Sequence, residues 1–315
     1  MRVLVTGGAG FIGSHLVDRL IERGDEVVVI DNLSQGKKEN INPKAKFYKK
    51  DIRDSGLEKI FRKYSFDVLF HAAAQVSIRA SIENPPLDAS INIQGSLNLF
   101  ELSRKYGVRK VVYTSSVAVY GEPQYLPCDE DHPIAPLSPY GVTKSSVEEY
   151  LYVYRTNYDI DYSIIRYPNV YGPRQSHTGE AGVIAIFSSK MLKGERVVIN
   201  GSGDQERDFL FIDDAIDASL SIIDLPIRKG HIDPTNLIFN LGTGKSVSVN
   251  NLFEILSKIT NYTLNPLYGP PRKGEIYQMQ VNATRVKKQL GWEPKINLEE
   301  GLQRTVEWFK THRIV

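Results

Sequence analysis

The feature that most limits how this 315-residue chain can fold is a glycine-rich run near its start, Gly7-Gly8-Ala9-Gly10-Phe11-Ile12-Gly13. The apolar stretch before it, Arg2–Thr6, suits a short buried strand. After it, an apolar residue recurs every four positions through Ile12–Leu20, and Gly24 ends this segment as a helix C-cap would. Strand, glycine turn and helix in this order predict a corner where backbone N–H groups at a helix N-terminus meet a pyrophosphate.

The same alternation continues through the first half of the chain. Strand-like apolar runs alternate with amphipathic segments; the further runs are Glu26–Ile30, Asp67–Phe70, Lys110–Thr114 and Tyr162–Arg166, and the segments are Asn92–Tyr106 and Val142–Tyr158. Repeated βα units predict an α/β fold built on a Rossmann-type, doubly wound and mainly parallel sheet.

An acidic residue ends the second apolar run. Asp31 follows Glu26–Ile30, where a carboxylate of this architecture binds both hydroxyls of an adenosine ribose. A carboxylate there repels a 2′-phosphate, so the sequence predicts NAD rather than NADP as the cofactor. The alternative, a turn aspartate before Asn32, is weaker because the glycine run and the strand register agree with the first interpretation.

After Arg166 the alternation of strand-like runs and amphipathic segments becomes less regular, and turn clusters become frequent. We expect two helices near the end of the chain, at Thr284–Leu290 and Leu298–His312, and a smaller α/β lobe. The strand-like runs Phe209–Ile212 and Leu237–Leu241 are expected to return to the main sheet. The predicted domains are therefore interleaved: residues 1–166 with about 209–243 bind NAD, and residues 167–208 with 244–315 bind the substrate.

Composition excludes several classes of function. The chain has 39 basic and 37 acidic residues, spread along its length, so neither nucleic acid nor a membrane surface is expected as a partner. Its single cysteine, Cys128, rules out intrachain disulfides and thiol metal clusters, and no metal site is predicted. Asp213-Asp214 is interpreted as a helix N-cap, and Glu148-Glu149 as a solvated helix face. The apolar start is interpreted as a strand rather than a signal peptide, which favours the cytoplasm.

A tyrosine and a lysine have the spacing of a catalytic pair. Tyr140 and Lys144 lie four residues apart, which places them on one face of a helix. A phenol with a pKa of about 10 is a poor base at neutral pH, and a nearby ammonium is expected to lower that pKa. The pair follows the apolar run Val111–Thr114 and the serines Ser115-Ser116, which should lie at the carboxyl edge of the sheet. The alternative is that they are only surface neighbours.

Together these motifs resemble the nucleotide-sugar epimerases and dehydratases of the extended short-chain dehydrogenase/reductases. The resemblance covers nearly the whole chain in the family's order. It rests on the glycine run Gly7–Gly13, His71-Ala72-Ala73-Ala74, Thr114–Gly121, Tyr140–Lys144, Arg166–Arg174, Arg207-Asp208-Phe209 and Arg272–Glu275.

The resemblance implies roles for individual residues. Catalysis would rest on Ser116, Tyr140 and Lys144, with Tyr140 as the base and Lys144 as its partner. The residues expected to bind the cofactor are Gly7, Gly10, Phe11, Ile12, Gly13, Asp31, Asn32, Asp51, Ile52, Ala73, Asn92, Tyr140 and Lys144. Those expected to bind the substrate are Ser116, Tyr140, Asn169, Arg207 and Arg272, because the fork of a guanidinium suits a diphosphate.

The implied reaction is NAD-dependent 4-epimerisation of a UDP-sugar, such as UDP-glucose and UDP-galactose, through a 4-keto intermediate. Related dehydratases carry an Asp–Glu pair after the catalytic hydroxyl, where this chain has Val117 and Ala118. An apolar pair cannot transfer protons, which favours simple epimerisation. A 4-epimerase of UDP-GlcNAc or UDP-glucuronate, and a dehydratase or decarboxylase, remain alternatives. A non-catalytic dinucleotide sensor is disfavoured because the catalytic residues are intact.

Three further expectations follow from the resemblance. Asn200 stands where relatives often place an aromatic that stacks on the base, so the base could be uracil or thymine. Met279 falls where side-chain size is thought to set tolerance for an N-acetyl group, and a flexible methionine decides neither way. The helices near Asn92–Tyr106 and Val142–Tyr158 match those that pair two subunits, which predicts a homodimer.

Overall fold

The computed structural model describes residues 1–178, 182–230, 232–271 and 276–312. They form two compact units that interleave along the chain. The first unit comprises Met1–Gly121, Ile134–Arg166 and Ile216–Phe239; the second comprises Glu122–Pro133, Tyr167–Ala215 and the chain from Asn240 onward. Within the described ranges, no helix combines the length and the apolar character that a membrane span requires.

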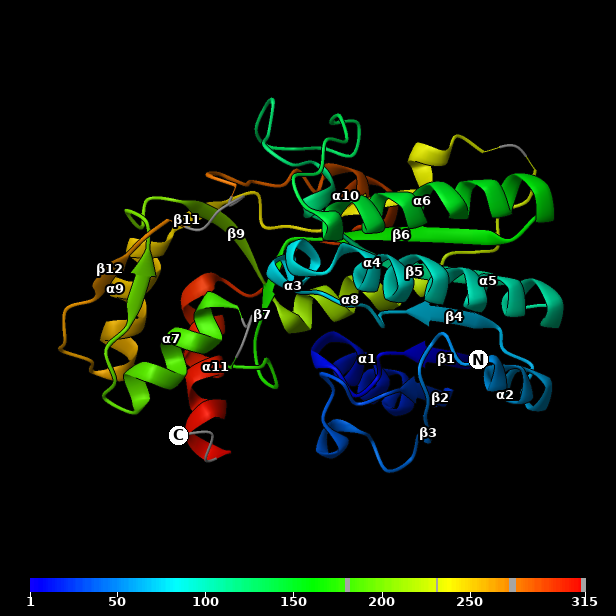
Figure 1. The fold of residues 1–315 in the computed structure, drawn as a ribbon, viewed down its shortest axis with the longest axis horizontal. Helices are drawn as coiled ribbons and strands as arrows, with labels where there is room; N and C mark the ends of the chain where they lie inside the picture. Colours follow the sequence, from blue (N-terminus) through cyan, green and yellow to red (C-terminus); the bar gives the residue numbers. More distant parts are fainter. Residues whose placement is uncertain (179–181, 231, 272–275, 313–315) are drawn as a thin grey trace. The chain divides into compact units, whose positions relative to one another are not determined.

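The first unit is built on a seven-stranded sheet with the order β10-β6-β5-β4-β1-β2-β3 (Figure 1). β1 pairs in parallel with both β2 and β4, β2 with β3, and β4 with β5. The strand order reverses between β4 and β1, and ligands of such sheets bind at the carboxyl ends of the strands at this point. The predicted doubly wound Rossmann-type sheet is confirmed. Its strands are β1 (Arg2–Thr6), β2 (Glu26–Asp31), β3 (Lys46–Lys49), β4 (Val68–His71), β5 (Lys110–Ser116), β6 (Asp161–Tyr167) and β10 (Ile238–Asn240).

Alternate residues of these strands face opposite layers of helices. Leu4 of β1 packs in a core with residues of α2 (Glu58–Lys63), α5 (Gly95–Tyr106) and α6 (Pro139–Tyr158), whereas its buried neighbours Val3 and Val5 do not belong to that core. α5 and α6 run side by side (Figure 1). α1 (Phe11–Glu22) is joined to α8 (Ile212–Ile223) by the ion pair Arg19–Asp217 at 2.7 Å.

Short helical elements precede α5. They are α3 (Ile78–Glu83), α4 (Pro85–Ala89) and a π-helical turn, Ser90–Gln94, that continues directly into α5. Both α3 and α4 contact α6. Single 3₁₀ turns occur at Lys38–Asn40, Ser55–Leu57, Val117–Val119 and Pro234–Leu237.

The second unit holds two small sheets and four helices of the described ranges. β9 (Glu206–Phe211) lies between β11 (Ser246–Ser248) and β7 (Asn169–Tyr171), and β12 (Leu267–Gly269) pairs with β8 (Val198–Asn200). The helices are α7 (Val183–Leu192), α9 (Val249–Thr260), α10 (Thr284–Leu290) and α11 (Leu298–Thr311). The two predicted C-terminal helices are thus present, α11 ending one residue before His312.

One predicted strand assignment is wrong. Leu237–Leu241 does return to the main sheet, as β10, but Phe209–Ile212 does not. Phe209 to Phe211 belong to β9, which pairs with β7, Phe209 lying opposite Asn169. An apolar run indicates a buried strand but carries no information about which sheet it joins. The boundaries of the two predicted domains remain a prediction.

Candidate active site

The glycine run makes a turn that closes on itself. Gly7 has φ +72°, and a Cβ on it would lie 2.7 Å from the Ala73 backbone nitrogen at the end of β4. A Cβ on Gly13 would lie 2.2 Å from the Gly7 carbonyl oxygen, and the Gly10 N–H donates to that oxygen at 3.0 Å. No side chain caps the N-terminus of α1, where the half-buried Phe11 and Ile12 begin the helix. Its first amide groups suit an anionic ligand.

Asp31 fastens the end of β2 to this turn. One carboxylate oxygen accepts from the Ala9 N–H at 3.0 Å, and the other accepts from the Leu33 N–H at 2.7 Å. The side chain is 8% exposed. A carboxylate oxygen can accept more than one hydrogen bond, so both oxygens of Asp31 retain acceptor capacity for ribose hydroxyls.

Asn32 and Asp51 come together after β2 and β3. The Asn32 side-chain amide donates to the Asp51 carboxylate at 3.0 Å. The Arg53 guanidinium, 2.8 Å from Asp51, holds the pKa of that carboxyl well below its usual range. Ile52, which lies between Asp51 and Arg53 in the sequence, is buried, and its carbonyl accepts a hydrogen bond from the Asn98 side-chain amide of α5 at 2.7 Å. The residues predicted to meet the adenine end of the cofactor therefore form one connected group.

A buried hydrogen-bond chain links β1, β4 and α5. His71 Nδ1 lies 2.7 Å from Thr6 Oγ1, and its Nε2 lies 2.9 Å from Ser96 Oγ. Ser96 donates to the Asn92 carbonyl, so it accepts from His71 Nε2–H, and Thr6 donates to Nδ1. Burial lowers the pKa of His71 to about 3, so the ring is neutral. His71 thus orders the surroundings of Ala73, whose N–H donates to Thr6 Oγ1 at 3.3 Å.

Asn92 lies in the π-helical turn, a distortion that often marks functional sites. Its amide nitrogen donates to Asp88 and Thr143 at 3.1 Å each, and to the Gln75 carbonyl at 3.0 Å. Its amide oxygen accepts from the Gln75 N–H at 2.8 Å. The side chain is thus engaged by the protein and orders this wall of the site.

The structure brings Ser116, Tyr140 and Lys144 together. Ser116 ends β5, and Tyr140 and Lys144 lie in the first turns of α6, which Ser138 caps. The Ser116 side chain interacts with the Tyr140 hydroxyl and opposes the rise in the pKa of that tyrosine. The Lys144 ammonium donates to the Thr114 carbonyl at 2.7 Å and lies 5.7 Å from the centre of the Tyr140 ring. The spacing argument for one shared face is therefore correct.

The sequence predicts that the Lys144 ammonium lowers the pKa of Tyr140, and this prediction is wrong for the protein without a bound cofactor. Burial raises the pKa of Tyr140 to about 12, against an opposing effect of the Ser116 hydrogen bond. Burial also lowers the pKa of Lys144 to about 8, although Asp88 and Glu148 oppose it. Both groups are driven toward their neutral forms because a buried charge loses its hydration. Tyr140 needs additional positive charge nearby before it acts as a base.

Two further predicted substrate residues, Asn169 and Arg207, belong to the second unit. Asn169 is exposed at the start of β7. Arg207 lies on β9 and donates to the carbonyls of Glu206, at 2.8 Å, and Tyr277, at 3.2 Å. Arg272 lies outside the described residues. Asp208, beside Arg207, is buried and accepts from Thr243 Oγ1 at 2.7 Å and from the Gly244 N–H at 3.0 Å, and burial raises its pKa.

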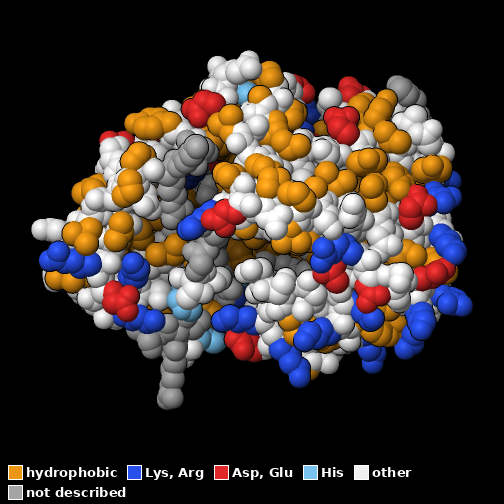
Figure 2. All heavy atoms as spheres, viewed as in Figure 1, with side chains coloured by type: hydrophobic (Ala, Val, Ile, Leu, Met, Phe, Trp, Pro, Cys, Tyr) orange, Lys and Arg blue, Asp and Glu red, His pale blue; other side chains and the backbone are white. Residues whose placement is uncertain are grey.

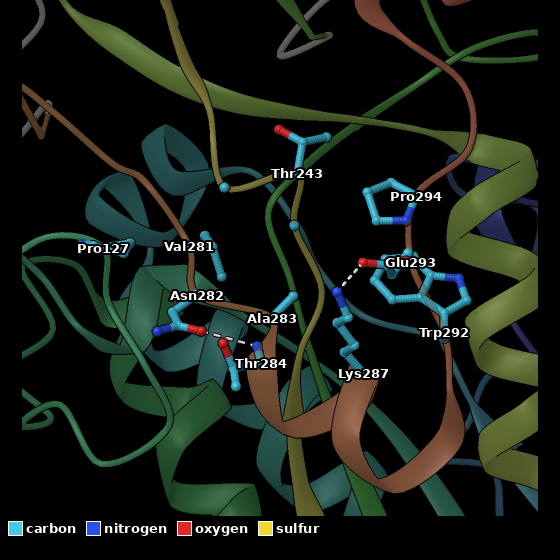
Figure 3. A pocket seen from close by; sticks show the side chains of 12 residues that line it. Pro127, Thr243, Val281, Asn282, Ala283, Thr284, Lys287, Trp292, Glu293 and Pro294 are labelled. Carbon is cyan, nitrogen blue, oxygen red and sulfur yellow. Dashed lines mark hydrogen bonds and ion pairs between the residues drawn. The ribbon is translucent and has the colours of Figure 1, made fainter.

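Figure 3 shows a pocket of about 300 Å³ within the second unit. It lies between the Gly242–Gly244 turn and the start of α10, and the ion pair Lys287–Glu293 bounds one side. None of the predicted site residues lines it.

Comparison with known proteins decides the family. The model of the NAD dependent epimerase/dehydratase family matches residues 3–242. This chain belongs to that family. A UDP-glucose 4-epimerase of Mycolicibacterium smegmatis is 43% identical over 98% of this chain and 99% of its own length. The resemblance drawn from the sequence motifs is confirmed.

Solved structures agree with this assignment. The structure of a UDP-glucose 4-epimerase from Thermotoga maritima with UDP-glucose has a TM-score of 0.94 and 47% identity, covering 99% of this chain and 100% of that one. A UDP-glucose 4-epimerase of Thermus thermophilus, in complex with NAD, has a TM-score of 0.91 and 38% identity, covering 98% and 99%.

The residues present fit the cofactor that the family's description names. The turn at Gly7–Gly13 leaves no room for a Cβ at two of its glycines, so its backbone is bare where a pyrophosphate must approach closely. Asp31 stands at the end of β2 with a carboxylate that suits ribose hydroxyls and repels a 2′-phosphate. The corner is therefore compatible with NAD in both charge and shape.

Sequence reasoning missed one functional candidate. Glu148 is not on a solvated face: it is buried against Arg166, whereas Glu149 is exposed. Its position one helical turn after Lys144 could have revealed this. In the described ranges, no group of three or more His, Cys, Asp or Glu could hold a metal ion. Asp214 instead accepts from the Lys295 and Ile296 N–H groups.

Proposed function

We propose that this chain is an NAD-dependent 4-epimerase of a nucleotide-sugar, with UDP-glucose and UDP-galactose as its two epimers. The observation that carries the proposal is that Ser116, at the carboxyl end of β5, interacts with Tyr140 of α6, whose ring lies 5.7 Å from the Lys144 ammonium. The names of the relatives described above support the choice of sugar nucleotide.

The chain's own residues handle the proton of the reaction. Tyr140 takes the proton of the sugar 4-hydroxyl, and Ser116 orients that oxygen and stabilises the phenolate. Lys144 supplies a nearby positive charge. NAD bound at the glycine turn and Asp31 would supply a reversible hydride acceptor for C4 and the positive charge that a tyrosine with a pKa of about 12 requires. Tyr140 returns its proton to the 4-oxygen once the hydride is back on C4, so proton and hydride are both restored and the reaction has no net redox change.

The residues after Ser116 favour epimerisation over dehydration. Val117 is buried and apolar, and Ala118 contributes only its N–H, which donates to Ser116 Oγ at 3.2 Å. Removal of water across C5 and C6, or loss of carbon dioxide, needs acid–base groups that this turn lacks. We propose that Asn169, Arg207 and Arg272 hold the diphosphate of the substrate during both hydride transfers.

The test is to incubate the purified protein separately with UDP-glucose, UDP-GlcNAc and UDP-glucuronate without added NAD, and to follow the products by proton NMR and mass. An isobaric 4-epimer of UDP-glucose supports the proposal and shows that NAD remains bound. Preference for UDP-GlcNAc or UDP-glucuronate would move the assignment to that sugar. Loss of water or carbon dioxide, or no reaction after NAD and dTDP-glucose are added, would contradict it.

We also propose that two copies pair through the face formed by α3, α4 and α6. Figure 2 shows hydrophobic side chains gathered where Figure 1 places these helices. The exposed apolar residues there are Ile78, Ile82, Leu87, Val142, Tyr150 and Val153. Such a face on a protein surface often marks an interface. Light scattering should give a dimer that Val153→Glu converts to a monomer, whereas the matched surface change Val198→Glu on β8 leaves it intact; a wild-type monomer at micromolar concentration would contradict this.

The cytoplasm is our proposed location. The support is that the apolar run Arg2–Thr6 is an interior strand, β1, of the main sheet.

A further inference from the structure

A buried ion pair between α6 and β6 contacts the segment that carries Ser116 and has no part in the proton transfers described above. Glu148 accepts from Arg166 through both carboxylate oxygens, at 3.1 Å from Nε and 2.5 Å from Nη2. The two side chains are 6% and 3% exposed. Burying two charges costs hydration free energy, which good geometry and further hydrogen bonds must offset. A pair of this kind is therefore not explained by stability alone.

The further hydrogen bonds reach both ends of the segment that carries Ser116. Ser115 Oγ donates to Glu148 on one side of Ser116. On the other side, Arg166 Nη1 donates to Tyr120 Oη at 2.9 Å, and the guanidinium lies 5.0 Å from the centre of the Tyr120 ring. The pair thus holds residues 115 and 120, and Ser116 lies between these two attachments in the sequence.

The same pair is attached to the helix that carries the tyrosine and the lysine. Glu148 lies on α6 one turn after Lys144 and two turns after Tyr140. The start of α6 packs tightly on the turn after Ser116, since a Cβ on Gly141 would lie 2.7 Å from the Ala118 carbonyl oxygen. Arg166 itself belongs to β6. One ion pair therefore joins β5, which ends at Ser116, to β6 and to α6, which carries Tyr140.

We propose that Glu148 and Arg166 are positioning residues, which hold the Ser115–Tyr120 segment against α6 and so fix the position of Ser116 relative to Tyr140. This inference rests on the proposed function of that site. Neither residue is assigned a contact with substrate. Their effect on the reaction is geometric, because a displacement of about 1 Å in a reacting group can cost about 100-fold in rate.

Two variants test the proposal without leaving a buried charge unpaired. Ser115→Ala removes the attachment before Ser116, and Tyr120→Phe removes the one after it. Each should lower kcat about tenfold, with an unchanged KM for UDP-glucose and unchanged NAD content. The apparent pKa of the basic group in the pH profile of kcat should rise, because a weaker Ser116 hydrogen bond no longer lowers the pKa of Tyr140. Ser115→Thr, which restores the hydroxyl, should recover the rate.

The matched control is Ser163→Ala. Ser163 is buried in β6 and accepts from Arg228 at 2.7 Å, without any bond to the Ser115–Tyr120 segment. It should lose stability like the other two variants but keep the wild-type kcat and pH profile. If Ser115→Ala and Tyr120→Phe also keep both, the positioning role is wrong.

A crystal structure of each variant separates this inference from the proposed function. The Ser116 Oγ to Tyr140 Oη distance should be longer in Ser115→Ala and Tyr120→Phe than in the wild-type protein, whatever reaction the protein catalyses. An unchanged distance in both variants would overturn the inference. An inactive wild-type protein whose variants do show the longer distance would instead contradict only the proposed function.

Discussion

Gly13→Ala should separate cofactor binding from folding more sharply than any other single change in the glycine corner. The added Cβ would lie 2.2 Å from the Gly7 carbonyl oxygen, 2.8 Å from its carbon and 2.9 Å from Gly8 Cα. All three contacts are backbone atoms, which cannot rotate away. Ordinary contacts begin at about 3.4 Å, so the turn and α1 must separate by roughly 1 Å.

The cost of that separation falls on the pyrophosphate site. Overpacking of this kind costs about 1–3 kcal/mol of stability, which a domain of this size can tolerate. The displaced amide groups no longer converge on a phosphate, so NAD affinity should fall at least tenfold and the purified protein should lack bound NAD.

The control is Gly24→Ala at the other end of the same helix. Gly24 has φ +93° and open space around its Cβ, so alanine there costs about 1 kcal/mol of backbone strain without touching the turn. NAD binding by calorimetry and the thermal midpoint should be measured for both variants. If Gly13→Ala binds NAD as tightly as Gly24→Ala does, the turn is not the pyrophosphate site.

Three other predictions use the same protein. Tyr140→Phe should lower the epimerisation rate about 10²- to 10⁴-fold with NAD still bound, and an NMR turnover above a tenth of the wild-type rate would exclude Tyr140 as the base. Asp31→Asn should weaken NAD binding several-fold in a titration and reduce the preference for NAD over NADP; equal affinities for NAD in both proteins would refute the ribose contact. The pKa of His71 is about 3 in the folded chain and 6.5 unfolded, so the folded state binds fewer protons between these values. The contribution of His71 to the free energy of unfolding should therefore be complete above pH 6.5 and should fall by about 1 kcal/mol per pH unit below pH 6.5. Denaturant titrations at pH 7 and pH 5 measure this difference, which should be smaller in His71→Gln than in the wild-type protein.

The parts of the site that sequence predicts are those whose signals are local. The glycine turn, Asp31 and the Tyr140–Lys144 spacing are each contained within one βα unit or one helix. Their geometry follows from the strand or helix that carries them, so the structure places them where the spacing indicated.

The errors concern partners that are distant in sequence. Glu148 was expected in solvent because most helix carboxylates are, and its partner Arg166 lies on β6, 18 residues away. Phe209–Ile212 is predicted in the wrong sheet. The hydrogen bonds that Thr243 and Gly244 donate to the neighbouring Asp208 come from residues distant in sequence, so the local pattern of Phe209–Ile212 does not reveal them. The raised pKa of Tyr140 has the same origin, since burial depends on the packed fold.

The central claim is that hydride leaves C4 of the sugar and returns to the same carbon. The most direct test is to supply UDP-glucose deuterated at C4, in ordinary water, and to examine the product by NMR. The account predicts UDP-galactose that retains deuterium at C4, because the label never reaches solvent. Product that carries a solvent proton at C4, or a label that moves to another carbon, would contradict it.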